Sequence, residues 1–237
     1  MTAIVINKKF LLFASVCCLL SVITTIGIHS SLFDLGALNF DERLLLFNDN
    51  RYLANRFWVI LHCLFVLISM WGFGLVQFNK SPGFIGLGFV LFSVFAFTEI
   101  FRQIFVMFYL NGLRRNFLEA DNTSQEVLRI SIENAGLVGY SLFGLFILTF
   151  ALGNIFYGLG LFKKNRIDTI LAILLLFWGF GNLIAFGNEF WEYGPISKTL
   201  ESFNIVFQPF FRLIIGFWMI FKWRKIKSNN DEMAHAI

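Results

Sequence analysis

Charged side chains are scarce in this chain. Asp, Glu, Lys and Arg make up only 14% of the 237 residues, whereas hydrophobic residues make up 57%. An ordinary soluble domain carries about 25% charged residues, and the mean hydropathy here is +0.72. The composition therefore excludes a soluble globular protein. We also expect no nucleic acid as partner, because the basic excess forms no continuous face and no stacking platform for bases accompanies it.

Residues that usually mark a metal centre or a catalytic motif are equally few. The chain has three cysteines and three histidines. Cys17, Cys18 and Cys63 fall within long apolar runs, without metal-ligand spacing or loop partners, so we expect packing residues and not disulfides. No His-Glu-x-x-His, glycine-rich phosphate loop or Gly-x-Ser-x-Gly motif occurs. We therefore expect no metal and no cofactor, and an enzyme is the least favoured class.

What the chain has instead is a series of long apolar runs. They cover about residues 10–28, 57–78, 84–110, 135–162, 167–188 and 203–221. Each approaches or exceeds the roughly 20 residues that cross a bilayer as a helix. We therefore predict an all-α polytopic membrane bundle of six transmembrane helices in a single domain, followed by a short cytoplasmic tail at 222–237. A cleaved signal peptide is the alternative for the first run, but the run continues to Ile28 and no good small-x-small site follows it.

Basic residues occupy alternate gaps between these runs. The two termini and the gaps after the second and fourth runs are basic, whereas the other three gaps are rich in Asp and Glu. The basic set consists of Lys8, Lys9, Lys80, Lys163, Lys164, Arg166, Lys222, Arg224, Lys225 and Lys227. Positively charged flanks stay in the cytoplasm. We therefore predict that both termini are cytoplasmic and that three longer loops lie outside.

Two of the outer gaps contain predicted helix starts. In the first, residues 39–47 indicate a short helix that the Asp41 carboxylate would cap. Its leucines would either rest on the membrane surface or fold over the bundle, and both alternatives stay open. In the third gap, residues 122–126 precede an apolar set that begins at Val127. That pattern predicts another helix start.

Polar side chains inside the predicted membrane helices are the candidates for ligand or ion binding. They are Glu99, Arg102, Arg212, His62, Asn182 and Gln208. Glu99 and Arg102 lie three residues apart and so share one helical face. At a rise of about 1.5 Å per residue, His62, Glu99, Asn182 and Gln208 all lie about 8 Å below the outer edge of a core about 30 Å thick. The sequence thus predicts one polar layer built from four helices.

Two interpretations of this layer remain open. A charge that faces lipid costs about 3 kcal/mol or more, so Glu99 should face the bundle interior and meet Arg102, Arg212 or His62. In the functional interpretation, the layer is a pocket open to the outside, where Glu99 binds a proton or cation, the arginines bind an anionic group and His62 tunes the site. In the structural interpretation, an ion pair joins the third and sixth helices, and the amides link helices to one another.

These features favour an integral membrane protein that binds or senses a small ligand in an outward-facing polar pocket. The first alternative is a small proton- or ion-coupled transporter that uses Glu99. The second is an intramembrane lipid-modifying enzyme that uses Glu99 and His62 as acid and base. The expected partners are the lipid bilayer and either a second copy of the chain or another membrane protein.

Three segments in the central half of the chain carry a family resemblance. They are Glu99-Ile100-Phe101-Arg102, the glycine-rich run at 152–161 and the basic turn at 163–166. Together they resemble bacterial multi-pass membrane families of similar length that are catalogued as domains of unknown function. Those families often place an arginine ahead of a glutamate in the third helix, whereas Glu99 precedes Arg102 here. The resemblance implies a bacterial inner-membrane protein and brings no activity with it.

Overall fold

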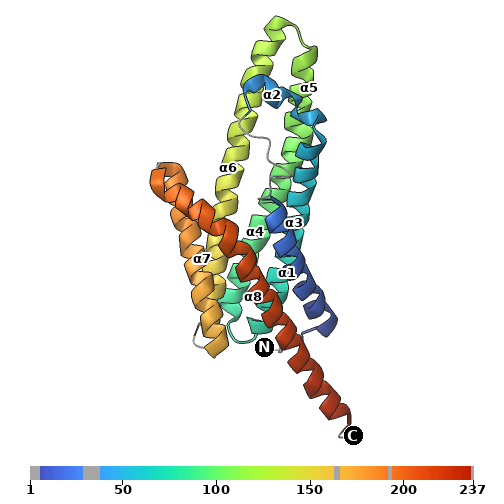
Figure 1. The fold of residues 1–237 in the computed structure, drawn as a ribbon, viewed down its shortest axis with the longest axis vertical. Coiled ribbons are helices and arrows are strands. Elements are labelled where there is room, and N and C mark those ends of the chain that lie inside the picture. The colour runs from blue at the N-terminus through green and yellow to red at the C-terminus, as the bar shows by residue number, and fades with distance from the viewer. Residues whose placement is uncertain (1–5, 29–37, 163–165, 192–193, 236–237) are drawn as a thin grey trace.

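The protein is a bundle of long helices in the computed structural model (Figure 1). The structure describes residues 6–28, 38–162, 166–191 and 194–235, with side chains at 6–28, 38–162, 166–188 and 205–226. These residues contain no strand, and six helices in them are long and apolar enough to cross a membrane. The predicted all-α bundle with six spanning helices is therefore confirmed. The spanning helices are α1 (Lys8–Ile28), α3 (Asn50–Phe78), α4 (Pro82–Phe105), α6 (Asn122–Leu161), α7 (Arg166–Trp191) and α8 (Gly194–His235).

The spanning helices are arranged as a ring. Going round it, α1 packs against α3, α3 against α4, α4 against α6, α6 against α7, α7 against α8, and α8 back against α1. The helices α3, α4, α6 and α7 pack mainly against their neighbours in chain order, as short antiparallel connections favour, whereas α8 packs mainly against α1 and so closes the ring. A ring of six helices has an interior toward which every member can present one face, and this arrangement positions the site described below.

The ring has two unlike ends (Figure 1). At the first, which we call the terminal end, lie the start of α1, the α3–α4 turn and the last part of α8. At the other, which we call the hairpin end, lie α2 (Phe40–Leu44), η1 (Leu45–Asn48) and α5 (Asn111–Glu119). The helix α6 has 40 residues, which makes it about 60 Å long, roughly twice the thickness of a bilayer core. The α5–α6 hairpin therefore extends beyond the membrane.

The structure changes the expected boundaries at the hairpin end. We predicted a gap between about residues 111 and 134, but only Ala120 and Asp121 interrupt the helices there. The third spanning helix passes from α4 through η2 (Val106–Leu110), which is one turn of π-helix, into α5. Apolar periodicity marks the part of a helix that lipid surrounds, and it does not mark where the backbone hydrogen bonds end. At the other end of the chain, α8 runs on through most of the predicted tail.

Helix starts at the hairpin end are capped by side chains. The Asp121 carboxylate accepts a hydrogen bond from the Ser124 amide at 2.8 Å, and this bond holds the pKa of Asp121 below its ordinary value. The predicted start near residue 122 is confirmed.

The predicted cap of α2 is wrong. The Asn39 side chain accepts a hydrogen bond from the Glu42 amide at 2.9 Å, and the Glu42 carboxylate accepts one from the Asn39 amide at 2.8 Å. This reciprocal pair satisfies two free donors, and Asp41 lies inside the first turn.

The segment after α2 folds back onto the protein and does not spread as an amphipathic helix on a membrane. Leu44 and Leu46 are buried in a small apolar cluster with Tyr52 of α3, Leu110 of η2 and Ile132 of α6. Of the two alternatives left open, the structure favours folding over the bundle for Leu44 and Leu46, whereas Leu45 between them is 57% exposed. The cluster ties together the helices that extend beyond the membrane.

Small residues allow the membrane helices to approach closely. Tyr157 of α6 is fully buried, lies against Gly74 and Gly88, and donates its hydroxyl proton to the Met70 carbonyl at 2.9 Å. A Cβ on Gly179 would lie 2.8 Å from the Ala151 carbonyl oxygen. Lipid tails supply no hydrophobic drive between helices, so contact of this kind contributes much of the packing.

We predict that Gly179→Ala destabilises the bundle whereas Gly181→Ala does not. A methyl group at Gly179 meets a backbone oxygen of α6, but one at Gly181 meets no heavy atom within 4 Å. Overpacking of this kind costs about 1–3 kcal/mol. Thermal unfolding in detergent measures the difference, and equal melting temperatures for the two variants would contradict the described α6–α7 contact.

Candidate functional site

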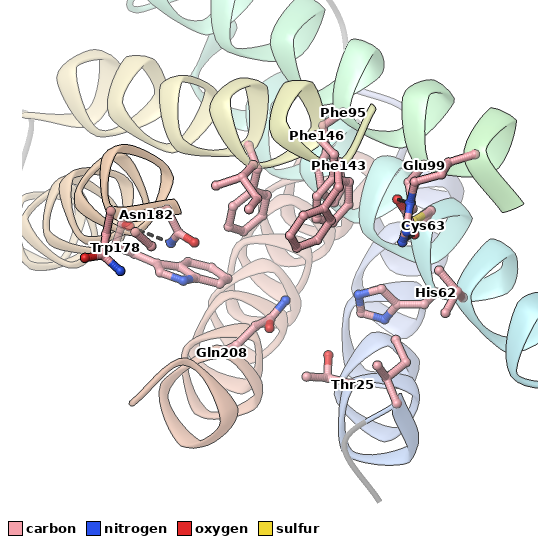
Figure 2. Close-up of a pocket in the computed structure, with 17 residues that line it drawn as sticks. Thr25, His62, Cys63, Phe95, Glu99, Phe143, Phe146, Trp178, Asn182 and Gln208 are labelled. Atoms are coloured by element: carbon pink, nitrogen blue, oxygen red, sulfur yellow. Dashed lines mark hydrogen bonds and ion pairs between the residues drawn. The ribbon is translucent and has the colours of Figure 1, made fainter. Parts of the chain in front are cut away.

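A cavity of about 450 Å³ lies inside the helix ring, in the half nearer the hairpin end. We call it the central pocket. Every spanning helix contributes to its lining, from Ile28 at the end of α1 to Gln208 of α8. Figure 2 shows side chains from different helices facing this common space. The aromatic part of the lining consists of Phe95, Phe143, Phe146, Phe150 and Trp178, and the polar part consists of Thr25, His62, Glu99, Arg102, Asn182, Asn188 and Gln208.

The pocket brings together most of the residues predicted from the sequence. His62, Glu99, Asn182 and Gln208, which we placed at one depth in four helices, all line it, as does Arg102. Arg212 does not belong to the lining. It lies behind the wall, 3% exposed, and bonds to two residues that do line the pocket.

Glu99 is held within its own helix. One carboxylate oxygen accepts from Arg102 Nη2 and from Gln103 Nε2, both at 2.6 Å, and the other accepts from Arg102 Nε at 2.7 Å. Such two-pronged contact between a guanidinium and a carboxylate is among the stronger polar interactions in proteins. Gln103 in turn accepts from Arg56 Nη1 of α3 at 3.0 Å. Glu99 is 2% exposed and Arg102 23%, so the carboxylate lies deeper than its cation.

The ion pair between the third and sixth helices, which belonged to the structural interpretation, is not found among the described residues. Among the residues whose side chains are described, Glu99 pairs with Arg102 of the same helix, and no carboxylate pairs with Arg212 of α8. The spacing explains this outcome. Residues three apart on a helix meet without any tertiary contact. Arg102 therefore pairs with Glu99 within α4 and donates hydrogen bonds to both carboxylate oxygens.

Arg212 is bound instead to neutral groups. Its Nη1 donates to Thr25 Oγ1 at 3.2 Å and to His62 Nε2 at 2.9 Å. A guanidinium has no acceptor, so His62 Nε2 must be unprotonated and the proton of the neutral ring lies on Nδ1. Nδ1 then donates to Thr24 Oγ1 at 2.8 Å, and the Thr24 hydroxyl donates to the Ser21 carbonyl at 3.1 Å. The relay joins α8, α3 and α1.

The predicted amides differ in what they do. Asn182 donates to the Trp178 carbonyl one turn earlier at 2.8 Å (Figure 2), which leaves its carbonyl oxygen available at the pocket. Gln208 lines the pocket and lies one turn before Arg212 on α8, on the same helical face. Asn154 of α6 makes the same local bond, to the Phe150 carbonyl at 2.8 Å, but it does not line the pocket.

A second polar cluster, which the sequence did not point to, lies at the terminal end. The Asp168 side chain of α7 is fully buried. It accepts from Gln77 Nε2 of α3 at 3.0 Å and lies 3.9 Å from Lys80 Nζ and 3.6 Å from Lys222 Nζ of α8. Asp168 falls at the start of the predicted run at 167–188, but it was not among the predicted site residues. Its position in the first turn of a helix that follows a basic segment was the available signal, because a carboxylate there lies at the membrane boundary.

The aromatic wall of the pocket was also missed, and no sequence signal could have found it. The chain has 33 phenylalanines, and they occur throughout the spanning helices. Thr25 and Asn188 are further lining residues that we did not predict. The cysteines behave as expected, since all three are free and buried. Among the described residues, no three His, Cys, Asp or Glu side chains gather as a metal site would require.

We predict that Glu99 couples energetically to Arg102 and not to Arg212. A double-mutant cycle in detergent with Glu99→Gln and Arg102→Gln should give a coupling free energy of about 1 kcal/mol or more. The matched cycle with Glu99→Gln and Arg212→Gln should give less than about 0.5 kcal/mol, the range of independent sites. The readout is the free energy of unfolding, and the reverse order of coupling would mean that the arginines have exchanged partners.

Comparison with known proteins adds no relative to this description. No protein-family model, curated protein or solved structure matches the chain. The resemblance to bacterial multi-pass families therefore stays a prediction, and the inference of function rests on the geometry of the pocket.

Proposed function

We propose that this chain is an integral membrane protein that binds a small ligand in the central pocket. The observation that supports this most is the lining itself. A cavity of about 450 Å³ is in the range of small-molecule sites, which are typically concave and mostly apolar with a few polar groups that fix orientation. Here aromatic rings from α4, α6 and α7 supply the apolar surface, and polar groups from α1, α3, α4, α7 and α8 converge on it.

Burial of these polar groups supports a binding role in a second way. Polar and ionisable residues within membrane helices are costly and usually belong to functional sites. A purely structural role would be met by local bonds such as those of Asn154 and Asn182. His62, Thr25 and Arg212 instead form a relay across three helices that borders an open cavity.

We further propose that the hairpin end faces the outside of the cell membrane, which in a bacterium is the inner membrane. The described basic residues Lys8, Lys9, Lys80 and Arg166 lie near the start of α1, the α3–α4 turn and the start of α7, all at the terminal end. Positively charged flanks remain cytoplasmic. The central pocket then opens toward the outer half of the membrane.

The orientation can be measured by cysteine labelling. The native cysteines are buried, so a membrane-impermeant maleimide should label intact cells only at an introduced thiol. We expect Glu126→Cys, at an exposed position of α6, to be labelled and Lys9→Cys, at an exposed position of α1, to be labelled only after lysis. The opposite pattern would reverse the proposed topology.

Transport is the second candidate, and the Asp168 cluster favours it. The cluster ties α3, α7 and α8 together at the terminal end, while the pocket lies toward the hairpin end. A bundle that is held together at one end and hollow toward the other matches one state of alternating access.

The lipid-modifying enzyme receives no comparable support, because both ring nitrogens of His62 already form hydrogen bonds within the protein.

Ligand binding should be lost when the pocket is filled. We expect Ala185→Trp, which places an indole at a lining position, to abolish thermal stabilisation by any small molecule that stabilises the wild type. At a ligand concentration one hundred times Kd, the wild type should gain about 2.7 kcal/mol. The assay is a thermal-shift screen of a small-molecule library in detergent.

The neighbouring substitution Ile184→Trp is the matched control, since Ile184 is 55% exposed on the outer face of the same helix. It should bind as the wild type does. A screen in which both variants keep every hit would place binding outside the central pocket. A hit that also crosses proteoliposome membranes in a pH-dependent manner, with loss in Glu99→Gln, would assign transport in place of binding alone.

A further inference from the structure

Arg212 is a buried cation that no described carboxylate neutralises. It is 3% exposed, and its hydrogen-bond partners among the described residues, the Thr25 hydroxyl and the His62 ring, are both neutral. Arg102 differs, because Glu99 accepts two hydrogen bonds from it. Burying a charge without a counter-ion is expensive. Counting Glu99, Arg102 and Arg212, the surroundings of the central pocket carry one excess positive charge.

The guanidinium of Arg212 lies directly behind the pocket wall. Its hydrogen bonds reach Thr25 and His62, and its central carbon lies 5.9 Å from the ring centroid of Trp178. All three of these residues line the pocket. Its Nη2 has no hydrogen-bond partner among the described residues. This buried positive charge, separated from the cavity only by residues that line it, favours a negative charge inside the pocket.

We infer that the ligand of the central pocket is an organic anion, with one negatively charged group and an apolar body. The inference rests on the proposed binding function. The charged group lies on the polar side of the pocket beside Thr25, His62 and Gln208, where the positive charge of Arg212 behind the wall favours it, and the apolar body packs against Phe146, Phe150 and Trp178. The Glu99 carboxylate does not oppose this, because both of its oxygens already accept hydrogen bonds from Arg102. A water-borne organic acid and an anionic lipid share this chemistry.

The test is a charge series on one apolar body. The probes are 4-phenylbutyrate, 4-phenylbutanol and 4-phenylbutylammonium, titrated by calorimetry into the full chain in phosphatidylcholine nanodiscs. We expect the carboxylate to bind on the order of tenfold more tightly than the alcohol, because the excess positive charge behind the wall attracts the ionised group. The ammonium should bind more weakly than the alcohol, because it meets an unpaired cation.

The variant arm assigns the preference to Arg212. We expect Arg212→Gln to lose the advantage of the carboxylate while binding the alcohol as the wild type does, and Arg212→Lys to keep part of that advantage. The matched control is Arg129→Gln, since the Arg129 side chain is 59% exposed on α6 and its loss should leave all three affinities unchanged. The wild-type series decides the question by itself if Arg212→Gln fails to fold.

The outcomes separate this inference from the proposed function. Equal affinity for the three probes would overturn the anion preference and leave a ligand pocket. Absence of binding by every probe would overturn both. A preference for the carboxylate that survives in Arg212→Gln would overturn the role of Arg212.

A lipid arm distinguishes the two sources of the anion. Titration of 4-phenylbutyrate is repeated in nanodiscs that contain phosphatidylglycerol. A weaker apparent affinity there would mean that an anionic lipid occupies the same site. An unchanged affinity would assign the site to a water-borne acid.

Discussion

The structure depends on the fact that a hydrocarbon core offers no hydrogen bonds. Every polar group within it must find a partner in the protein or remain at a cost. Most of the polar side chains here meet this constraint locally, by bonding to a carbonyl one turn back. Ser15, Thr149, Asn154 and Asn182 all do so. Such bonds need no neighbouring helix and therefore say little about function.

The charged residues meet the same constraint in three different ways. Glu99 takes a cation from its own helix and needs no tertiary contact. Asp168 collects Gln77, Lys80 and Lys222 from other segments and so ties the terminal end of the ring. Arg212 receives only neutral acceptors. The third arrangement is energetically the least complete, and it lies beside the cavity.

Ring geometry explains why the cavity and these residues coincide. Helices that approach at small residues, such as α6 and α7 near Gly179, leave little space between them. On their inner faces the same helices present phenylalanines and Trp178, and large rings from several sides enclose space that none of them fills. The polar layer then forms part of the wall of that space.

Much of the membrane architecture was determined by the sequence alone. A long apolar run crosses lipid as an α-helix, because only then are its backbone hydrogen bonds formed within the segment. The six runs correspond to six helices long and apolar enough to span a membrane. The common depth of His62, Glu99, Asn182 and Gln208 also followed from the chain, because the rise per residue of a helix is constant. The structure places those four around one cavity. The α5–α6 hairpin was not foreseen, because its helices continue where lipid no longer requires an apolar surface.

Only the tertiary structure decided the partner of Arg212. The sequence allowed Glu99 to pair with Arg102, Arg212 or His62, and helix spacing alone accounts for the Glu99–Arg102 pair. The tertiary structure brought Arg212 of α8 to His62 of α3. It also gathered the aromatic wall from 33 phenylalanines and buried Asp168. Helix depth is a one-dimensional quantity that the chain encodes directly. Helix rotation and neighbours depend on the packing of all six helices together, so they are properties of the folded bundle.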